Sequence, residues 1–453
     1  MKKIVLISAV AFVLGGCGIY TKYQRPAVDD VVNRLYTPSN PDDSTSIAML
    51  EWEDLFADER LQALIRTGLR NNTDLNVARL KVAEAEATLQ TSRLAYVPSV
   101  AFEADGSVKN TNFEQTSTGA SAGFSVGWEV DIFGRLTNAK RGAQAALIAS
   151  ESYRQAVQTQ LVATIADSYY TLLMLDQQLA ISRRTLDTWE ENIRTMEALK
   201  RAGKTNEAAV LQAKSNRLSV EGSVLTLTRQ IAQQQNSLCA LLGVTPHTIR
   251  RGELAEQSFP EVLHTGVPAQ LLSRRPDVRQ AEMNLAQAFY NTNAARSEFY
   301  PKITLGGTLG WSSAGAAIAN PSSWILNAVA GLVQPVFAKG QNKARLRTAQ
   351  ARQEQALLQF RQSLLDAGTE VNNALIQWQT AKERLEIDKR QIVHLRAAVW
   401  NTKLLMKHGL TNYLEVLTAQ QNLLQAELTE ISDKYAEIQG VIHLYHALGG
   451  GVE

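Results

Sequence analysis

An internal duplication is the feature of this 453-residue sequence that most constrains its fold. Tyr96-Val97-Pro98 and Phe299-Tyr300-Pro301 lie 203 positions apart, as do Asn72-Thr73-Asp74-Leu75 and Arg275-Pro276-Asp277-Val278. Gly203 and Gly409 lie 206 positions apart, each after a helix-like run. Matching motifs in the same order are typical of a tandem repeat. We therefore expect two structural repeats, 73–243 and 276–449, joined by a proline-containing connector, 244–275.

The apolar residues that follow the middle of each repeat recur in alternating steps of three and four. This heptad runs through Leu172, Leu175, Leu179, Ser182 and Leu186, and again through Trp378, Ala381, Leu385, Asp388 and Ile392. A sustained 3.5-residue period predicts left-handed coiled coils. Residues 144–202 contain neither proline nor glycine, so the helix expected over 135–200 is about 100 Å long at 1.5 Å per residue.

The opening and returning helices of each repeat are shorter than the long helix between them. In the first repeat we expect an opening helix over 73–95 and a returning helix over 206–242. Their combined length, roughly 90 Å, is close to that of the long helix. This predicts that the two shorter helices lie end to end beside the long one, with the connector where they meet.

Between the opening and long helices the apolar period changes to two, which predicts two strands in each repeat. The expected strands are 99–110 and 118–133 in the first repeat, and 302–312 and 324–337 in the second. One apolar and one mostly polar face, at about ten residues per strand, is typical of a transmembrane β-barrel. The alternative is a soluble, half-buried hairpin.

Four strands are too few to close a barrel, and open strand edges are not tolerated in lipid. Closure would therefore need several chains around a symmetry axis. Two chains would give 8 strands, whose interior the side chains nearly fill, whereas three would give 12 and leave a lumen.

The first residues have the pattern of an export signal. Lys2 and Lys3 precede the apolar run 4–14, and Gly15-Gly16-Cys17 follows it. The run is too short to span a bilayer. We expect residues 1–16 to be a lipoprotein signal peptide and Cys17 to be acylated; the alternative is an ordinary signal peptide that contains a cysteine. The signal favours an outer-membrane location, with 17–72 as a lipid-anchored periplasmic segment and 450–453 as a tail.

Composition and local motifs argue against several other classes of protein. A net charge of +2 gives no reason to expect nucleic acid as a partner. A charged fraction of 20% excludes a polytopic helical membrane protein. Gly203-Lys204-Thr205 ends like a phosphate-binding loop, but Ala198 stands where that motif needs glycine. His443 and His446 are three positions apart and do not form an H-E-x-x-H motif, so a metal site there is not expected. We expect no enzyme activity, no cofactor and no metal.

Several motifs in this order and spacing resemble the TolC-like outer-membrane factors, especially the OprM-like and NodT-like lipoprotein branch of resistance-nodulation-division (RND) efflux systems. The resemblance covers essentially the whole mature chain. Its marks are Tyr23-Gln24-Arg25-Pro26, Asn71-Asn72-Thr73-Asp74-Leu75, Trp128-Glu129-Val130-Asp131-Ile132-Phe133-Gly134-Arg135, Arg274-Arg275-Pro276-Asp277-Val278 and Tyr413-Leu414-Glu415-Val416-Leu417.

The resemblance implies a mixed α and β fold built by a homotrimer: a transmembrane β-barrel in the outer membrane above a long α-helical coiled-coil barrel in the periplasm. It also implies two partners, a periplasmic adaptor (membrane fusion) protein and an inner-membrane RND transporter. The function that follows is an outer-membrane exit duct, held in outer-membrane lipid, that passively conducts small molecules out of the cell.

Family likeness also suggests the residues of the periplasmic aperture. The turns at Gly203 and Gly409 would be the periplasmic tips, and Glu415 stands where the family often carries an acid. Thr418 stands where many relatives have Asp. The ring of acidic side chains that the family places at the aperture would therefore be incomplete in this chain. On helix statistics alone, a solvated acid on a coiled-coil flank explains Glu415 better.

Two other functions remain open at this point. One is the outer-membrane duct of a type I protein-secretion system, which shares the fold. The other is a non-conducting coiled-coil lipoprotein that links envelope components, although a scaffold needs no polar-lined barrel. The sequence does not specify the transported compound.

Overall fold

A computed structural model describes residues 21–32, 34–35, 46–111, 113, 115–259, 264–265, 268, 271–314 and 323–451. The chain divides into two compact units, each assembled from separated stretches of sequence. The first contains 1–27, 79–152 and 279–362, and the second contains 28–78, 153–278 and 363–453. Each unit therefore takes a matching part from both repeats.

The helices repeat in length as well as in order. Helices α5 (Thr73–Leu94) and α9 (Pro276–Ser297) have 22 residues each, and α6 (Arg135–Arg201) and α10 (Gln341–Lys407) have 67 each. Helices α7 (Glu207–Leu241) and α11 (Tyr413–Ala447) have 35 each. From α6 onward the boundaries of these helices recur 206 positions later, as a tandem duplication predicts.

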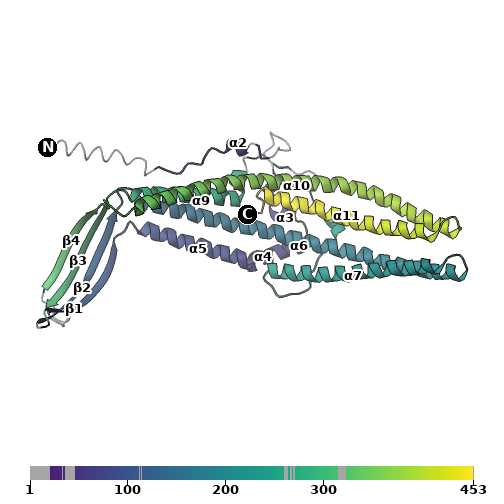
Figure 1. The fold of residues 1–453 in the computed structure, drawn as a ribbon, viewed down its shortest axis with the longest axis horizontal. Helices are drawn as coiled ribbons and strands as arrows, with labels where there is room; N and C mark the ends of the chain where they lie inside the picture. Colours follow the sequence, from purple (N-terminus) through teal and green to yellow (C-terminus); the bar gives the residue numbers. More distant parts are fainter. Residues whose placement is uncertain are drawn as a thin grey trace. The chain divides into compact units, whose positions relative to one another are not determined.

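In the second unit α6 and α7 form one antiparallel hairpin and α10 and α11 form another (Figure 1). Trp189 and Met196 of α6 pack against Ala209, Val210 and Val220 of α7 in one buried cluster. Four of the five heptad residues named for α10 are buried too, namely Ala381, Leu385, Asp388 and Ile392, and Trp378 is half-buried. Inward-facing residues at this spacing hold coiled coils together.

The end of each returning helix meets the start of the opening helix of the same repeat. In the first repeat the side-chain amide of Asn72 donates a hydrogen bond to the carbonyl oxygen of Leu241, at 2.9 Å. In the second repeat the Arg275 guanidinium donates to the carbonyl oxygen of Ala447, also at 2.9 Å. Hydrogen bonds thus join the last turn of the returning helix to the residue that precedes the opening helix in both repeats.

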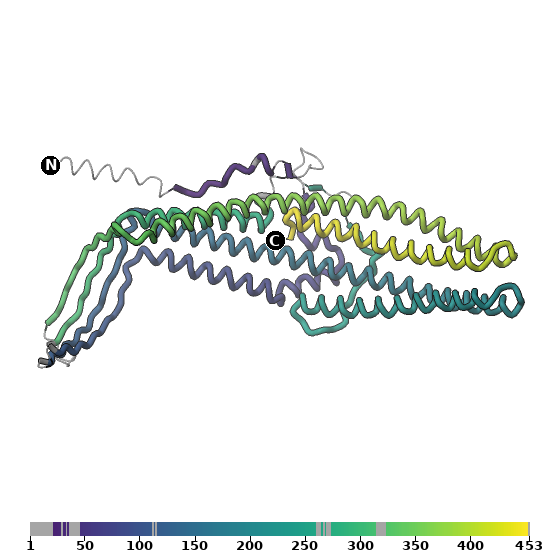
Figure 2. The backbone as a smooth tube through the Cα atoms, in the orientation of Figure 1, coloured from purple at the N-terminus to yellow at the C-terminus, as the bar shows by residue number. Residues whose placement is uncertain are grey.

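The first unit contains a four-stranded antiparallel sheet in the order β1-β2-β3-β4, visible as neighbouring strands in Figure 2. The strands are β1 (Ser99–Thr111), β2 (Gln115–Val130), β3 (Lys302–Ala314) and β4 (Ser323–Val333). Strand β2 ends before the expected residue 133 because Asp131 caps the next helix. Strand β4 ends before 337 because Pro335 has no N–H to donate.

Short elements occupy the segment before the first repeat and the connector. They are α2 (Asp29–Val32), η2 (Ile47–Met49), α3 (Trp52–Leu55), α4 (Glu59–Asn71), η3 (Leu254–Glu256) and α8 (Leu271–Arg274). None of the described helices combines the length and the apolar character needed to cross a membrane.

Candidate functional site: the sheet, its helix junction and the helical turns

The strand register gathers the apolar side chains of all four strands on one face of the sheet. Phe102 pairs with Phe124, Phe124 with Leu309, and Leu309 with Leu326, so one apolar row crosses the sheet. Neighbouring rows are also mostly apolar, for example Trp128–Leu305–Ala330 and Trp311–Trp324. Aromatic rings lie together across strands, with centroids 5.4 Å apart for Phe102 and Phe124. The face is broad and water-exposed in a single chain.

The opposite face of the sheet is mostly polar or small. Its rows include Glu103–Gly123–Gly310 and Asp105–Ser121–Ser312, and Ser125 donates a hydrogen bond to Glu103 at 2.8 Å. Ile325 and Val329 of β4 are apolar exceptions on this face, so the alternation of apolar and polar residues is poorer in this strand. A sheet with one apolar and one polar face matches the two environments of a membrane barrel.

Strands β2 and β3 are joined to the start of α6 by one cluster of charged side chains, most of which belong to the Trp128-to-Arg135 motif. Both carboxylate oxygens of Glu129 accept hydrogen bonds from Arg135, at 2.6 and 2.7 Å, and Lys302 approaches to 2.9 Å. Asp131 accepts from the backbone N–H groups of Leu136 and Thr137, at 3.0 and 2.8 Å. An acidic side chain that caps a helix N-terminus is a recognisable sequence signal.

The segment around Tyr23 and Arg25 is held against the second repeat within the first unit. Arg25 donates two hydrogen bonds to the carboxylate of Glu282 on α9, at 2.8 and 2.7 Å. The backbone N–H of Tyr23 donates to the hydroxyl of Tyr290 at 3.2 Å, and the Tyr23 ring packs edge-on against Phe289. The Tyr23-to-Pro26 motif therefore positions the chain shortly after the expected lipidation site.

Arg275 organises the second junction between helices. Its side chain is buried and bonds Asp277, Glu370 and the carbonyl of Ala447 at distances of 2.5 to 2.9 Å. Burial and the nearby Arg275 charge lower the pKa of His446 below its ordinary value. The Arg274-to-Val278 motif thus joins α9, α10 and α11.

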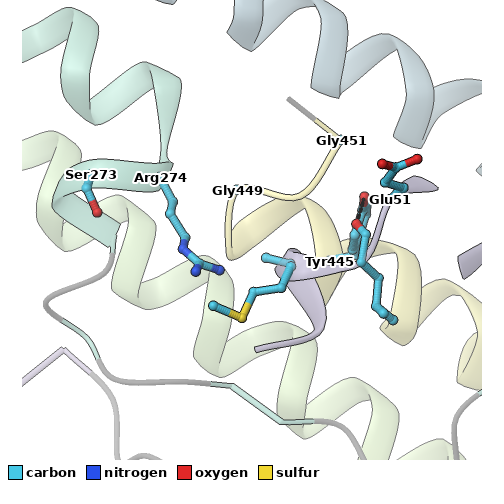
Figure 3. Close-up of a pocket in the computed structure, with 9 residues that line it drawn as sticks. Glu51, Ser273, Arg274, Tyr445, Gly449 and Gly451 are labelled. Carbon is cyan, nitrogen blue, oxygen red and sulfur yellow. Dashed lines mark hydrogen bonds between the residues drawn. The ribbon is translucent and has the colours of Figure 1, made fainter. Parts of the chain in front are cut away.

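A cavity of about 360 Å³ lies beside this junction (Figure 3). The side chains of Glu51, Ser273 and Arg274 line it, together with the backbone around Gly449. The Tyr445 hydroxyl donates to the carbonyl oxygen of Leu50 at 2.8 Å. Gly449 has a φ of +85°, and a Cβ there would meet the Arg274 carbonyl oxygen at 2.9 Å. Glycine is needed at this position for both reasons.

Gly203 and Gly409 lie in the turns that end α6 and α10, with φ of +69° and +74°. In each turn the glycine N–H bonds back three residues and the next N–H bonds back five, for example Lys204 to Leu199 at 2.9 Å and Leu410 to Leu405 at 3.0 Å. This is the Schellman ending of a helix. Gly203-Lys204-Thr205 is therefore a helix–helix connection and follows no strand.

Glu415 and Thr418 lie one turn apart in the first turns of α11, and both are exposed. The Thr411 hydroxyl donates a hydrogen bond to the Glu415 carboxylate, and the Asn412 side chain caps the helix by accepting from the N–H groups of Leu414 and Glu415. The pair is thus next to the Gly409 turn and open to solvent. The expected lipidation site, Cys17, lies outside the described residues.

The comparisons with known proteins agree on one family. The family model for outer membrane efflux proteins matches residues 64–244 and 267–450, close to the two repeats. The cation efflux system protein CusC of Escherichia coli K12 is 32% identical, over 98% of each chain. The toluene efflux pump outer membrane protein TtgC of Pseudomonas putida is 30% identical, over 99% of this chain and 96% of its own.

Solved structures have the same fold. The open state of the Neisseria gonorrhoeae MtrE outer membrane channel superposes with a TM-score of 0.86 at 28% identity, over 96% of this chain and 98% of that one. These findings confirm the predicted fold class, the efflux-channel function and the outer-membrane location. The chain belongs to the outer membrane efflux protein family.

Proposed function

We propose that this chain forms, as a homotrimer, the exit duct of a tripartite RND-type efflux assembly that includes a periplasmic adaptor and an inner-membrane transporter. The observation that carries the proposal is the continuous apolar face across β1 to β4, with β1 and β4 at the two edges of the sheet. An edge strand in lipid needs a partner for its backbone groups. Another copy of the chain offers a strand of similar length and polarity, since the edge strands β1 and β4 have 13 and 11 residues.

Three copies fit the number of strands that a duct needs. The sheet contributes four strands per chain, so three chains supply twelve. An eight-stranded barrel is nearly filled by its own side chains, whereas twelve strands leave room for a lumen. The glycine-, serine- and threonine-rich face of β2 and β3 would line it.

The helical hairpins supply the periplasmic part of the proposed duct. The turns at Gly203 and Gly409 would be its periplasmic tips, and Glu415 and Thr418 would face the aperture beside the second turn. Acylation of Cys17 would add a lipid anchor to the barrel. The duct would be passive, because the transporter at the inner membrane supplies the energy.

The cargo of the proposed assembly is set mainly by the transporter. The relatives CusC and TtgC are named for cation and toluene efflux, yet this chain is about equally similar to both. Because similar ducts serve different cargoes, we infer that the duct itself does not select the transported compound. We therefore propose small molecules as the cargo class.

Accumulation of a fluorescent efflux dye in cells lacking this gene tests the proposal. The deletion should raise accumulation, and the intact chain should reverse the effect. Leu309→Arg places a charge on the apolar face and should abolish the rescue, because a lipid-facing arginine costs about 2–4 kcal/mol near the bilayer centre. Thr308→Arg, on the opposite face, should still rescue.

Equal rescue by both arginine variants would contradict the assignment of the two faces. Unchanged dye accumulation in the deletion strain, together with loss of an exported protein, would point to the duct of a type I secretion system instead.

A further inference from the structure

The connection between β4 and α10 differs in charge from its counterpart in the first repeat. The segment that leads into α10 corresponds to the segment that leads into α6, because the two helices begin 206 positions apart. Glu129 and Asp131 lie in the segment before α6. At the corresponding positions before α10 the chain has Pro335 and Phe337, and Lys339 follows them. The second connection therefore has no carboxylate and carries a positive charge.

The basic charge continues into the first turns of α10. Residues 299–353 contain no aspartate or glutamate, and their basic residues are Lys302, Lys339, Lys343, Arg345, Arg347 and Arg352. Lys302 pairs with Glu129, and Arg345 lies 3.6 Å from Glu298. Lys339, Lys343 and Arg347 are exposed and pair with no carboxylate of the residues that the structure describes. These three residues, spaced by four, are called the basic cluster below.

Exposed apolar side chains lie directly before the basic cluster. Val336 is 94% exposed and Phe337 is 84% exposed. They follow β4, whose last residue on the apolar face of the sheet is Leu332. The other connections between strands and helices expose apolar side chains as well, namely Leu94, Val97, Ile132 and Phe299. Apolar side chains beside lysine and arginine are typical of a protein surface at the boundary between lipid and water.

All four strand–helix connections lie at one edge of the sheet (Figure 1). The antiparallel register brings the start of β1 beside the end of β2, and it pairs Lys302, at the start of β3, with Val333, at the end of β4. In the proposed barrel the hydrocarbon layer ends at this edge, and a headgroup layer several ångström thick follows it. Arg347 lies eight residues beyond Lys339, which is at most about 12 Å of helix. The basic cluster therefore lies at the depth of the headgroups.

We propose that Lys339, Lys343 and Arg347, with Val336 and Phe337 beside them, bind the headgroups of anionic phospholipids in the leaflet next to the helices. The ammonium and guanidinium groups contact the phosphodiesters, and the two apolar side chains enter the edge of the acyl layer. The inference rests on the proposed barrel, because only a sheet that spans the membrane brings the cluster to a leaflet.

A second copy of the chain offers no acidic partner at this level. In the proposed trimer β4 pairs with β1 of the next copy, so the residues around the start of β1 lie nearest to the basic cluster. Residues 87–102 contain Arg93 as their one charged residue. Like charges oppose a contact between proteins. A bilayer leaflet supplies negative charge and an apolar layer together, so it fits both parts of the surface.

Lipid retention by the purified trimer tests the proposal. The full chain is reconstituted in nanodiscs that contain equal amounts of phosphatidylglycerol and phosphatidylcholine, and native mass spectrometry then counts the lipids of each kind that remain bound. The wild type should retain phosphatidylglycerol in preference. The variant with Lys339→Gln, Lys343→Gln and Arg347→Gln should lose roughly ten- to a hundredfold of this preference, because each basic residue near an anionic surface contributes about a fivefold change.

The matched control carries Lys389→Gln, Arg390→Gln and Lys407→Gln on the same helix. It loses the same number of exposed positive charges, beginning roughly 70 Å farther along α10. Its lipid preference should equal that of the wild type, and the conservative Lys343→Arg should keep the preference too. Raising the salt from about 0.05 M to about 0.5 M should weaken the wild-type preference, because salt screens exposed charges.

Phe337→Asp gives a second, independent measurement. It places a carboxylate where the first repeat has Asp131 and leaves every basic residue in place. The new charge should repel the phosphodiesters, so this variant should retain less phosphatidylglycerol, whereas Phe337→Leu should behave as the wild type. Retention by Phe337→Asp at the wild-type level would overturn the proposed contact.

Three further outcomes would overturn the proposal. Equal retention of both lipids by the wild type, or equal losses in the glutamine variant and its control, would reject the site. Displacement of phosphatidylglycerol by excess inorganic phosphate would show that the cluster binds free phosphate and not lipid. Loss of the trimer by the glutamine variant in discs of phosphatidylcholine alone would show that a second copy covers the cluster.

The same experiment separates this inference from the proposed function. A wild-type trimer that restores dye efflux and retains both lipids equally rejects the lipid site and leaves the duct intact. A wild-type chain that is monomeric in the nanodisc rejects the proposed duct, and the lipid site with it. Rescue of dye efflux by each variant verifies that the variant folds and inserts.

Discussion

The side-chain amide of Asn72 donates to the carbonyl oxygen of Leu241 at 2.9 Å, while its side-chain oxygen accepts from the backbone N–H of Leu75 at 3.0 Å. One buried residue therefore caps the start of α5 and holds the end of α7. Because the two helices come from opposite ends of one repeat, this contact closes the repeat.

Replacing Asn72 by alanine should lower the stability of the purified protein by about 1–3 kcal/mol, because one helix cap is lost and one buried carbonyl loses its donor. Asn72→Asp keeps the cap acceptor and loses only the donor, so its effect should be smaller. Thermal unfolding followed by circular dichroism in detergent measures both variants. An alanine variant as stable as the wild type would show that the contact does not hold the repeat together.

The acid pair between α10 and α11 predicts a pH-dependent stability. Burial, together with the hydrogen bond to Asp433 and the Asp433 charge, raises the pKa of Asp388 to about 6. Glu430 also raises this pKa, and Arg384 lowers it. The folded state then binds a proton more tightly than the unfolded state, whose aspartate titrates near 4. This contribution to stability is thus greatest at low pH and is lost as pH rises through about 6.

Asp388→Asn should remove this dependence and stabilise the protein at pH 7.5 by on the order of 2 kcal/mol, because the amide carries no charge beside Asp433. Unfolding midpoints at pH 5 and 7.5 test the expectation. Glu383→Gln, an exposed acid on the same helix, is the control and should leave the pH slope unchanged. The same slope in Asp388→Asn as in the wild type would exclude Asp388 as its source.

The proposed aperture residues predict opposite changes in ion selectivity. Glu415→Gln should lower the preference of the reconstituted channel for cations, because it removes one carboxylate per chain from the aperture. Thr418→Asp should raise that preference by adding one. Reversal potentials in planar bilayers at low salt, where screening is weak, provide the measurement. Unchanged selectivity in both variants would place these exposed residues away from the ion path.

Cys17→Ala should abolish lipid attachment, because it removes the thiol group that we expect to carry the lipid. Mass spectrometry of the mature N-terminus tests this directly, since the wild type should carry the mass of the acyl chains. A wild-type N-terminus without added mass would contradict lipidation. Efflux by the unlipidated variant would not contradict the duct, because a closed barrel is itself held in the membrane.

The elements with periodic signals could be predicted from the amino-acid sequence alone. The heptad through Leu172 and Leu186 predicts α6, and the alternation through Phe124 and Val126 predicts β2, because both patterns record which side chains face away from water. The spacing between Gly203 and Gly409 likewise predicts the duplication. All of these signals are spacings along the sequence, so they can be read without knowledge of the tertiary contacts.

Only the tertiary structure shows which residues that are far apart in the sequence contact each other. Nothing in the local pattern indicates that Asn72 reaches Leu241, that Arg25 pairs with Glu282, or that Lys302 joins Arg135 at Glu129. The end of β2 is different, because the cap that Asp131 provides to α6 is a contact between near neighbours in the sequence. Hydrogen bonds and charges act between residues far apart in sequence, and their geometry exists only once the helices and strands have packed.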